Sequence, residues 1–288
     1  RGRSFDEPSF LIIDEAQLIR DKKRGVLLHQ ALNFANAKYI VRKTIFCSPV
    51  VKNPEVFNGF SKNILKQEAI KSFTSPVAQN LLSVTYVPKK TNQYRVKLFD
   101  DFLGEMKIGT YKAMTKRNAN KTGKNYFLSH LFNEISQKVP GKSIIYVPNP
   151  DDADKVAKLI ADLRPDKNDS ELDEFSDFCA QEIHGEYWPG ITIKKGVGIH
   201  YGSMPTRVRE NIESLFVDSK HMDVVVCTST LAQGVNFPAR NIFILNPTRE
   251  GEPIDKADFW NIVGRAGRLK HGFDGNIFLL HKPTAQDL

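Results

Sequence analysis

The chain has 288 residues, 41% of them hydrophobic and 26% charged, which is ordinary for a globular protein of one large or two smaller domains. Its three cysteines form no CxxC pair and its histidines show no metal-ligand spacing, so we expect neither a disulfide framework nor a zinc site. No apolar run approaches the roughly 18 residues of a membrane-spanning helix, and the first residues are unlike a signal peptide. We expect an intracellular, cytoplasmic protein, and the net charge of +8 is compatible with a polyanionic partner.

The first part of the chain predicts two neighbouring strands that end in polar groups. The apolar run 9–13 indicates a buried parallel strand that ends at Asp14 and Glu15, and the next strand, 44–47, ends at Ser48. We therefore expect Ser48 to lie beside the two acids. An acid pair at a strand end can hold Mg²⁺ through water and can orient or deprotonate an attacking water, and an acidic turn without function is the alternative.

Strands and helices alternate along the rest of the chain, interrupted by a basic connector at 111–124 that contains no acid. Before the connector, the patterns predict helices over 25–37 and 57–73 and extended segments over 81–87 and 93–99. After it, they predict strands at 143–147, 196–199, 223–227 and 241–245, helices over 126–139 and 149–163, and an acidic helical insert near 164–182. This alternation predicts an α/β fold with parallel sheets and helices on both faces.

Two local patterns have structural rather than catalytic interpretations. Gly141-Lys142-Ser143 is not a phosphate-binding loop, because Ser136 stands where that loop needs a glycine and the tripeptide precedes its strand instead of following it. We find no P-loop elsewhere in the sequence. Cys47 and Cys227 each end an apolar run and are expected to be buried.

Three later segments carry groups suited to phosphate. Residues 200–207 and 228–230 follow predicted strands, where hydroxyls and backbone amides can hold a nucleic-acid backbone; helix capping by Ser203 and Ser229 is the alternative. In the third segment, Arg265 and Arg268 stand three residues apart between glycines. On a helix this spacing lies on one face, and two guanidiniums there could close on a transferred phosphoryl group.

Taken in order, these segments resemble the motifs of the superfamily-two nucleic-acid helicases, most closely the Ski-type branch, and the resemblance covers nearly the whole chain. The matching segments are Ile12–Gln17 (motif II), Ser48–Val50 (III), Ser143–Asn149 (IV), Gly198–Met204 (IVa), Thr228–Pro238 (V) and Asn261–Arg268 (VI). The sequence departs from the family's usual residues at Gln17, Val50 and Asn261, and motifs I, Ia and Ib are not found.

The resemblance implies ATP and Mg²⁺ as cofactors and a catalytic role for five residues. Asp14 would hold Mg²⁺ through water, Glu15 would act on the hydrolytic water, and Gln17 belongs to the same motif. Arg265 and Arg268 would reach the γ-phosphate from the opposite lobe as arginine fingers.

The resemblance also implies binding roles for four residues. Gly234 and Asn236 would face the nucleotide cleft, and Gly202 and Thr228 would contact the backbone of DNA or RNA. No segment indicates base recognition.

The implied architecture is two RecA-like lobes: a partial first lobe over 1–82, an extended basic connector over 83–125 and a complete second lobe over 126–288. It implies part of an ATP-dependent DNA or RNA helicase or translocase. Because the P-loop is not found, we expect a C-terminal part of the core, separated from the rest by cloning, gene splitting or proteolysis and inactive as an isolated ATPase. The alternatives are a non-catalytic half-core that binds nucleic acid or a partner protein, and a subunit of a restriction or defence complex.

Overall fold

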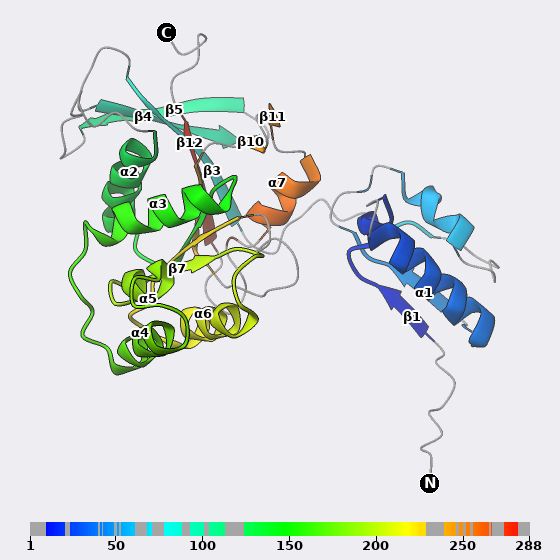
Figure 1. The fold of residues 1–288 in the computed structure, drawn as a ribbon. Helices are drawn as coiled ribbons and strands as arrows, with labels where there is room; N and C mark the ends of the chain where they lie inside the picture. Colours follow the sequence, from blue (N-terminus) through cyan, green and yellow to red (C-terminus); the bar gives the residue numbers. More distant parts are fainter. Residues whose placement is uncertain are drawn as a thin grey trace. The chain divides into compact units, whose positions relative to one another are not determined.

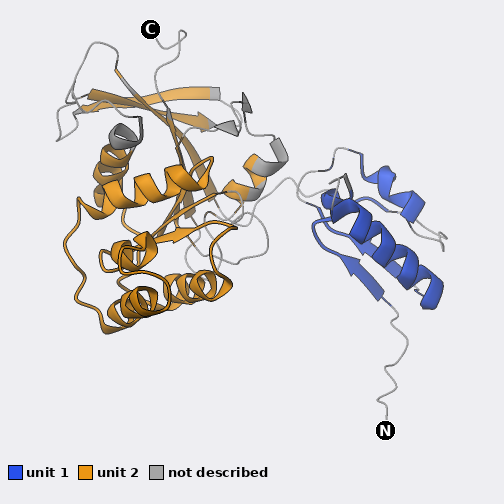
Figure 2. Ribbon diagram, in the orientation of Figure 1, with its two compact units in different colours: residues 1–74 blue, residues 75–288 orange. Residues whose placement is uncertain are grey.

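The computed structural model describes residues 10–20, 24–39, 41, 43–48, 51, 53–60, 68–70, 78–87, 93–100, 104–112, 124–228, 239–245, 248–249, 252–253, 256–264, 266 and 274–281. The chain divides into two compact units between residues 74 and 75 (Figure 2). Within the described residues, no helix combines the length and the apolar character needed to cross a membrane.

Unit 1 is built on two short parallel strands, β1 (Phe10–Ile13) and β2 (Lys43–Phe46). The connection between them contains η1 (Ala16–Arg20) and α1 (Arg24–Lys38), and η2 (Pro54–Phe60) follows β2 (Figure 1). A small core of buried side chains joins these elements; its members are Ile13, Ala16, Leu32 and Phe57. The ring of Phe57 stacks on that of Phe46 at 4.9 Å between centroids, which fixes η2 against the end of β2.

Unit 2 is built on one eight-stranded sheet with the order β5-β4-β3-β12-β9-β6-β8-β7. Its strands are β3 (Ala78–Tyr86), β4 (Gln93–Asp100), β5 (Gly104–Lys112), β6 (Ser143–Tyr146), β7 (Val197–His200), β8 (Val224–Cys227), β9 (Asn241–Leu245) and β12 (Asp274–His281). The run from β3 to β7 in this order is parallel, and β4 and β5 extend it as antiparallel neighbours. The predicted α/β class with a mostly parallel sheet is confirmed.

Helices connect these strands, and a separate antiparallel pair, β10 (Thr248–Arg249) and β11 (Glu252–Pro253), follows β9. The helices are α2 (Lys124–Lys138), α3 (Pro150–Ala161), α4 (Ser170–Glu182), α5 (Trp188–Ile193), α6 (Thr206–Asp218) and α7 (Lys256–Val263). The crossover from β6 to β7 runs opposite to that from β7 to β8, so right-handed crossovers place α3 and α6 on opposite faces of the sheet.

The core of unit 2 is a continuous apolar layer between the sheet and its helices. At its centre, Phe243 of β9 stacks on Phe278 of β12 at 4.6 Å and meets Phe132 of α2 edge-on at 4.7 Å. Phe132 and Phe243 are fully buried and Phe278 nearly so. These ring contacts pack α2 against β9 and β12 in the middle of the sheet.

Several predicted elements match the structure closely. The strand predicted at 241–245 coincides with β9, and α3 begins as its sequence indicates, with Asn149 as N-cap and Pro150 in the first turn. The side chain of Asn149 accepts a hydrogen bond from the Asp152 backbone N–H at 2.8 Å, which satisfies one of the amides that a helix start leaves unpaired.

Other expectations need correction. Of the helix predicted over 57–73, the described part is a 3-10 helix that ends at Phe60, and residues 68–70 have no regular structure. Cys227 is buried as expected, but Cys47 is exposed, because β2 belongs to the small two-stranded sheet of unit 1. Parts of the predicted connector belong to the main sheet: residues 83–86 lie in β3, residues 93–100 form β4 and residues 104–112 form β5.

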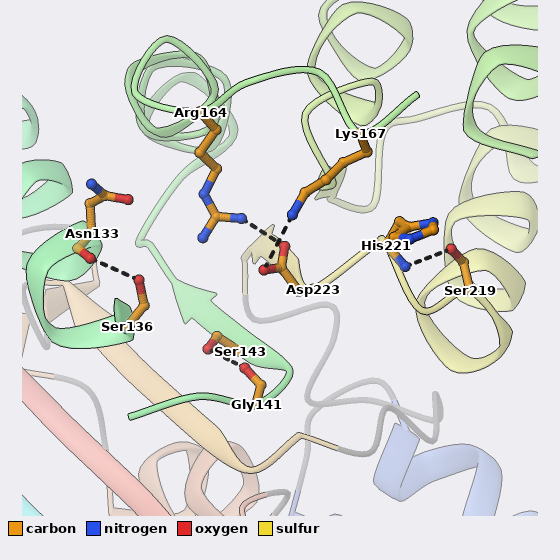
Figure 3. Close-up of polar contacts among 9 residues, drawn as sticks. All are labelled: Asn133, Ser136, Gly141, Ser143, Arg164, Lys167, Ser219, His221 and Asp223. Carbon is orange, nitrogen blue, oxygen red and sulfur yellow. Dashed lines mark hydrogen bonds and ion pairs between the residues drawn. The ribbon is translucent and has the colours of Figure 1, made fainter. Parts of the chain in front are cut away.

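The N-terminal edge of the parallel strands holds a polar network that stabilises the fold. Figure 3 shows Arg164 and Lys167 reaching toward Asp223 at the start of β8. Arg164 Nη1 lies 2.6 Å from Asp223 Oδ1, and Lys167 Nζ lies 4.0 Å from Asp223 Oδ2. Nearby, the Lys142 ammonium donates to the backbone carbonyls of Phe216, Val217 and Ser219, which terminates α6, and burial lowers the pKa of Lys142. Lys142 thus has a structural role, at the opposite end of β6 from the phosphate-binding position.

We expect Asp223→Asn to lower the free energy of unfolding by about 1 kcal/mol, because Arg164, whose side chain is only 12% exposed, loses its counter-charge while Asp223 itself is partly solvated. Urea unfolding followed by circular dichroism measures this loss. Asp173→Asn is the matched control, since its pair with Lys194 is 3.5 Å long and lies between half-exposed side chains, and it should change stability by less than about 0.5 kcal/mol. Equal effects of the two substitutions would contradict the assignment.

Candidate functional site

In unit 1, the two predicted acids follow directly after β1 and are exposed to solvent. The Asp14 carboxylate accepts a hydrogen bond from the Glu15 backbone N–H at 2.8 Å. Glu15 has φ +51°, a left-handed conformation that a non-glycine residue rarely adopts, so the chain turns sharply between β1 and η1. Such an outlier at a polar strand end is a physical reason to consider the turn functional.

The turn after β1 is tied to the end of β2 by backbone and side-chain hydrogen bonds. Cys47 N donates to Ile13 O at 2.8 Å, and Ala16 N donates to Cys47 O at 2.9 Å. Beyond this ladder, Ser48 Oγ donates to Gln17 Oε1 at 2.7 Å, and Gln17 Nε2 donates to a carboxylate oxygen of Glu15. The prediction that Ser48 lies beside the acids is confirmed.

The chain of groups Ser48–Gln17–Glu15 can orient the Glu15 carboxylate. A hydrogen-bonded Glu15 has a defined direction, whereas Asp14 presents carboxylate oxygens, which are the ligands that Mg²⁺ prefers. Across the described residues, no group of three or more His, Cys, Asp or Glu side chains could hold a metal. Asp14 and Glu15 offer two carboxylates, so a magnesium ion bound there would keep several of its waters.

In unit 2, the predicted backbone-binding residues lie at the carboxyl ends of adjacent strands. Gly202 follows β7 and is exposed, while Thr228 follows β8 and is largely buried, with its N–H donating to His200 O at 3.2 Å. Because β7 and β8 are parallel, Gly202 and Thr228 lie at the same edge of the sheet. Ser203 is not the cap of α6, because the N-cap position is Pro205, whose side chain makes no capping hydrogen bond. Ser229 lies outside the described residues.

The loop after β7 is held by side chains of α3 and α6. His200 Nε2 lies 2.9 Å from Glu213 Oε1 on α6, and the Tyr201 hydroxyl donates to Asp154 Oδ2 on α3 at 3.5 Å. Burial raises the pKa of Tyr201 to about 12, so this hydroxyl keeps its proton at neutral pH. Gly202 thus follows two anchored residues, which presents its backbone to solvent in a fixed position.

Burial lowers the pKa of His200 below its ordinary value near 6.5, although the Glu213 carboxylate opposes the shift and Arg209 of α6 adds to it. Neutral His200 therefore contributes stability that is fully present above about pH 6.5 and is lost as pH falls from there through the folded-state pKa. We expect wild-type protein to lose up to about 1 kcal/mol more than His200→Gln between pH 7.5 and 5.5. Urea unfolding at both pH values measures this, and equal losses would refute it.

The predicted arginine pair, Arg265 and Arg268, lies outside the described residues. In the described backbone around it, α7 ends at Val263, and Ala266 forms a parallel bridge with Ala239. Ala266 N donates to Val263 O at 3.0 Å, so the described backbone closes a tight turn here. The predicted cleft residues Gly234 and Asn236 also lie outside the described residues.

The register of the sheet separates the two candidate regions of unit 2. Gln79 near the start of β3 pairs with Gly275 near the start of β12, and its side chain contacts the turn that contains Ala266. The turn therefore lies at the amino ends of the parallel strands, whereas Gly202 and Thr228 lie at their carboxyl ends. Sequence reasoning missed Gln79, because no motif or periodicity distinguishes a glutamine that acts across 187 residues.

Comparison with known proteins shows the family to which the chain belongs. A family model described as the helicase conserved C-terminal domain matches residues 124–270. The chain is 30% identical over 158 residues to the Escherichia coli K12 protein named "Anti-bacteriophage protein B", a match that covers 54% of this chain and 21% of that protein. It is 25% identical over 287 residues to a Caenorhabditis elegans "Helicase POLQ-like" protein (94% and 28%) and 35% identical over 103 residues to the rat "Activating signal cointegrator 1 complex subunit 3" (34% and 5%). The chain thus spans less than a third of each of these relatives.

Proposed function

Because this chain belongs to the helicase conserved C-terminal domain family, we propose that it forms part of an ATP-dependent helicase or translocase core of the Ski type. The observation that carries the ATP-dependent part of this proposal is the Ser48–Gln17–Glu15 hydrogen-bond chain beside Asp14. These hydrogen bonds join the acid pair to Ser48 at the end of β2. A movement of Glu15 on nucleotide binding or hydrolysis would therefore also displace Ser48.

Asp14 and Glu15 would have different roles at the nucleotide. Asp14 would hold Mg²⁺, which supplies charge neutralisation on the phosphate oxygens when bound. Glu15, oriented by Gln17, would position the attacking water and take its proton. Gln17 would also couple the position of the Glu15 carboxylate to that of Ser48, since its amide is hydrogen-bonded to both side chains.

Unit 2 would supply the remaining groups. Arg265 and Arg268 would neutralise charge that develops on the transferred phosphoryl group, and Gly234 and Asn236 would line the nucleotide cleft. Gly202 and Thr228, at the carboxyl edge of the sheet, would grip the backbone of a nucleic-acid strand without reading its bases. Cycles of ATP binding and hydrolysis would then drive movement along that strand.

We propose that these residues work within a longer parent protein. The relatives are several times longer than this chain, and ATP hydrolysis needs an amide cradle and a lysine of the kind a P-loop provides, which these 288 residues lack. The alternative of a non-catalytic binding half-core is not favoured by the comparisons, since the relatives include a protein named as a helicase.

The test is ATP hydrolysis by the parent protein with and without single-stranded DNA or RNA. We expect nucleic acid to stimulate turnover, and the stimulation to decline as salt rises, because phosphate contacts release counterions. A parent protein that binds nucleic acid but has no ATPase activity would overturn the proposal and restore the non-catalytic alternative.

A further inference from the structure

One side chain of the sheet holds the turn from Val263 to Ala266, which spans Arg265 in sequence and ends two residues before Arg268. Gln79, the second residue of β3, directs its amide nitrogen at the carbonyl oxygens of Val263 and Ala266, at 3.3 Å and 3.2 Å. The amide nitrogen carries two hydrogens, so it can donate to both carbonyls at once. In Figure 1, α7 lies beside β3, which brings these segments together across more than 180 residues of sequence.

The backbone of this turn is constrained from several directions. Val263 O also accepts the Ala266 N–H at 3.0 Å, and Gly264 N donates to Trp260 O at 2.9 Å, which ends α7. Ala266 pairs with Ala239, and both Val263 and Ala266 are fully buried. The Gln79 amide is the side-chain contact that bridges the first and last residues of the turn.

Gln79 ties the turn to the main sheet, because its backbone lies in β3 and its side chain is hydrogen-bonded to the turn. Its backbone lies in the ladder with Gly275 of β12, and β12 in turn pairs with β9 in the middle of the sheet. The backbone of Gln79 thus belongs to the parallel core, and its side chain reaches from there to the end of α7. The neighbouring Asn80, by contrast, donates to Asn276 Oδ1 of β12 at 3.0 Å, a contact within the sheet.

We propose that Gln79 is a positioning residue for the motif that contains Arg265 and Arg268: by holding the carbonyls of Val263 and Ala266, it fixes the described backbone before and after Arg265. This inference rests on the proposed function, in which those arginines stabilise the transferred phosphoryl group. A displacement of about 1 Å at such a group can cost about 10²-fold in rate, so a hydrogen bond remote from the nucleotide can control turnover.

The decisive variant is Gln79→Glu, which keeps the size of the side chain but replaces the two-hydrogen donor with an oxygen that repels both carbonyls. In the parent protein, we expect its kcat for ATP to fall about 10²-fold with KM for ATP and affinity for single-stranded nucleic acid unchanged within about twofold. Gln79→Ala should fall about 10-fold, and Gln79→Asn, which retains a shorter amide donor, should recover part of that loss. Asn80→Ala is the matched control and should stay within about twofold of wild type.

Binding of ADP with aluminium fluoride, a mimic of the transferred phosphoryl group, separates positioning from a purely structural role. Gln79→Glu should weaken this complex by a factor similar to its loss in kcat while the affinity for ADP alone and the unfolding midpoint stay as in wild type. Wild-type kcat in Gln79→Glu would overturn the inference, as would parallel losses in kcat, ADP affinity and thermal midpoint. Absence of ATPase activity in wild type would instead refute the proposed function.

Discussion

Glu15→Gln is expected to lower the ATP turnover number of the parent protein about 10²–10⁴-fold, the range over which a positioned general base contributes. The substituted side chain has the same length and can still accept the hydrogen bond from Gln17, so the turn after β1 should keep its shape. What it loses is the negative charge and the ability to take a proton from water.

The control for this substitution is Glu55→Gln, an exposed carboxylate in the first turn of η2 in the same unit. It should leave turnover within about twofold of wild type. Steady-state ATP hydrolysis at saturating nucleic acid measures both variants. Wild-type turnover in Glu15→Gln would remove Glu15 from the proposed mechanism, and ATP binding retained by an inactive variant would support a role in the chemical step.

Arg268→Ala is expected to have an effect at least as large, about 10³–10⁵-fold in kcat, because an arginine finger neutralises charge that appears only in the transition state. Arg268→Lys should not rescue it, since an ammonium cannot reproduce the planar two-pronged contact of a guanidinium. The same pattern is expected for Arg265, the other arginine of the motif Arg265-Ala266-Gly267-Arg268.

Arg240→Ala is the control for the arginine pair. Arg240 lies just before β9, and its guanidinium pairs with Asp274 at 2.8 Å between half-exposed side chains, outside the proposed chemistry. It should cost little stability and leave kcat within about twofold of wild type. Losses of kcat in Arg268→Ala no larger than in Arg240→Ala would show that the motif does not act on the phosphoryl group.

Features that depend on neighbouring residues could be predicted from the sequence. Strand ends with polar groups, such as Asp14 and Ser48, were found because an apolar run predicts a strand and parallel strands bring their carboxyl ends together. The start of α3 at Asn149 and Pro150 followed from the chemistry of helix capping alone.

Features that depend on residues far apart in the chain could not be predicted from the sequence. The pairing of β12 with β3 joins segments almost 200 residues apart, and no local pattern encodes it. The exposure of Cys47 follows from the size of the sheet around it, and the end of α7 at Val263 is set with the bridge between Ala266 and Ala239. Gln79 is invisible for the same reason: its partners are backbone carbonyls, which every residue has.

The segment between Thr228 and Ala239 connects the two candidate regions of unit 2. Thr228 lies at the carboxyl end of β8, beside the proposed nucleic-acid contact, and Ala239 pairs with Ala266 at the other end of the sheet. The described residues at the two ends of this segment therefore lie at opposite ends of the parallel strands.

The central claim is that ATP hydrolysis at the acid pair drives movement on nucleic acid, and displacement of a labelled strand from a tailed duplex tests it most directly. The parent protein should displace the strand with ATP and Mg²⁺ and should fail with a non-hydrolysable ATP analogue, while Glu15→Gln should bind the duplex and not displace the strand. Displacement that is equally fast without hydrolysis, or in Glu15→Gln, would contradict the account.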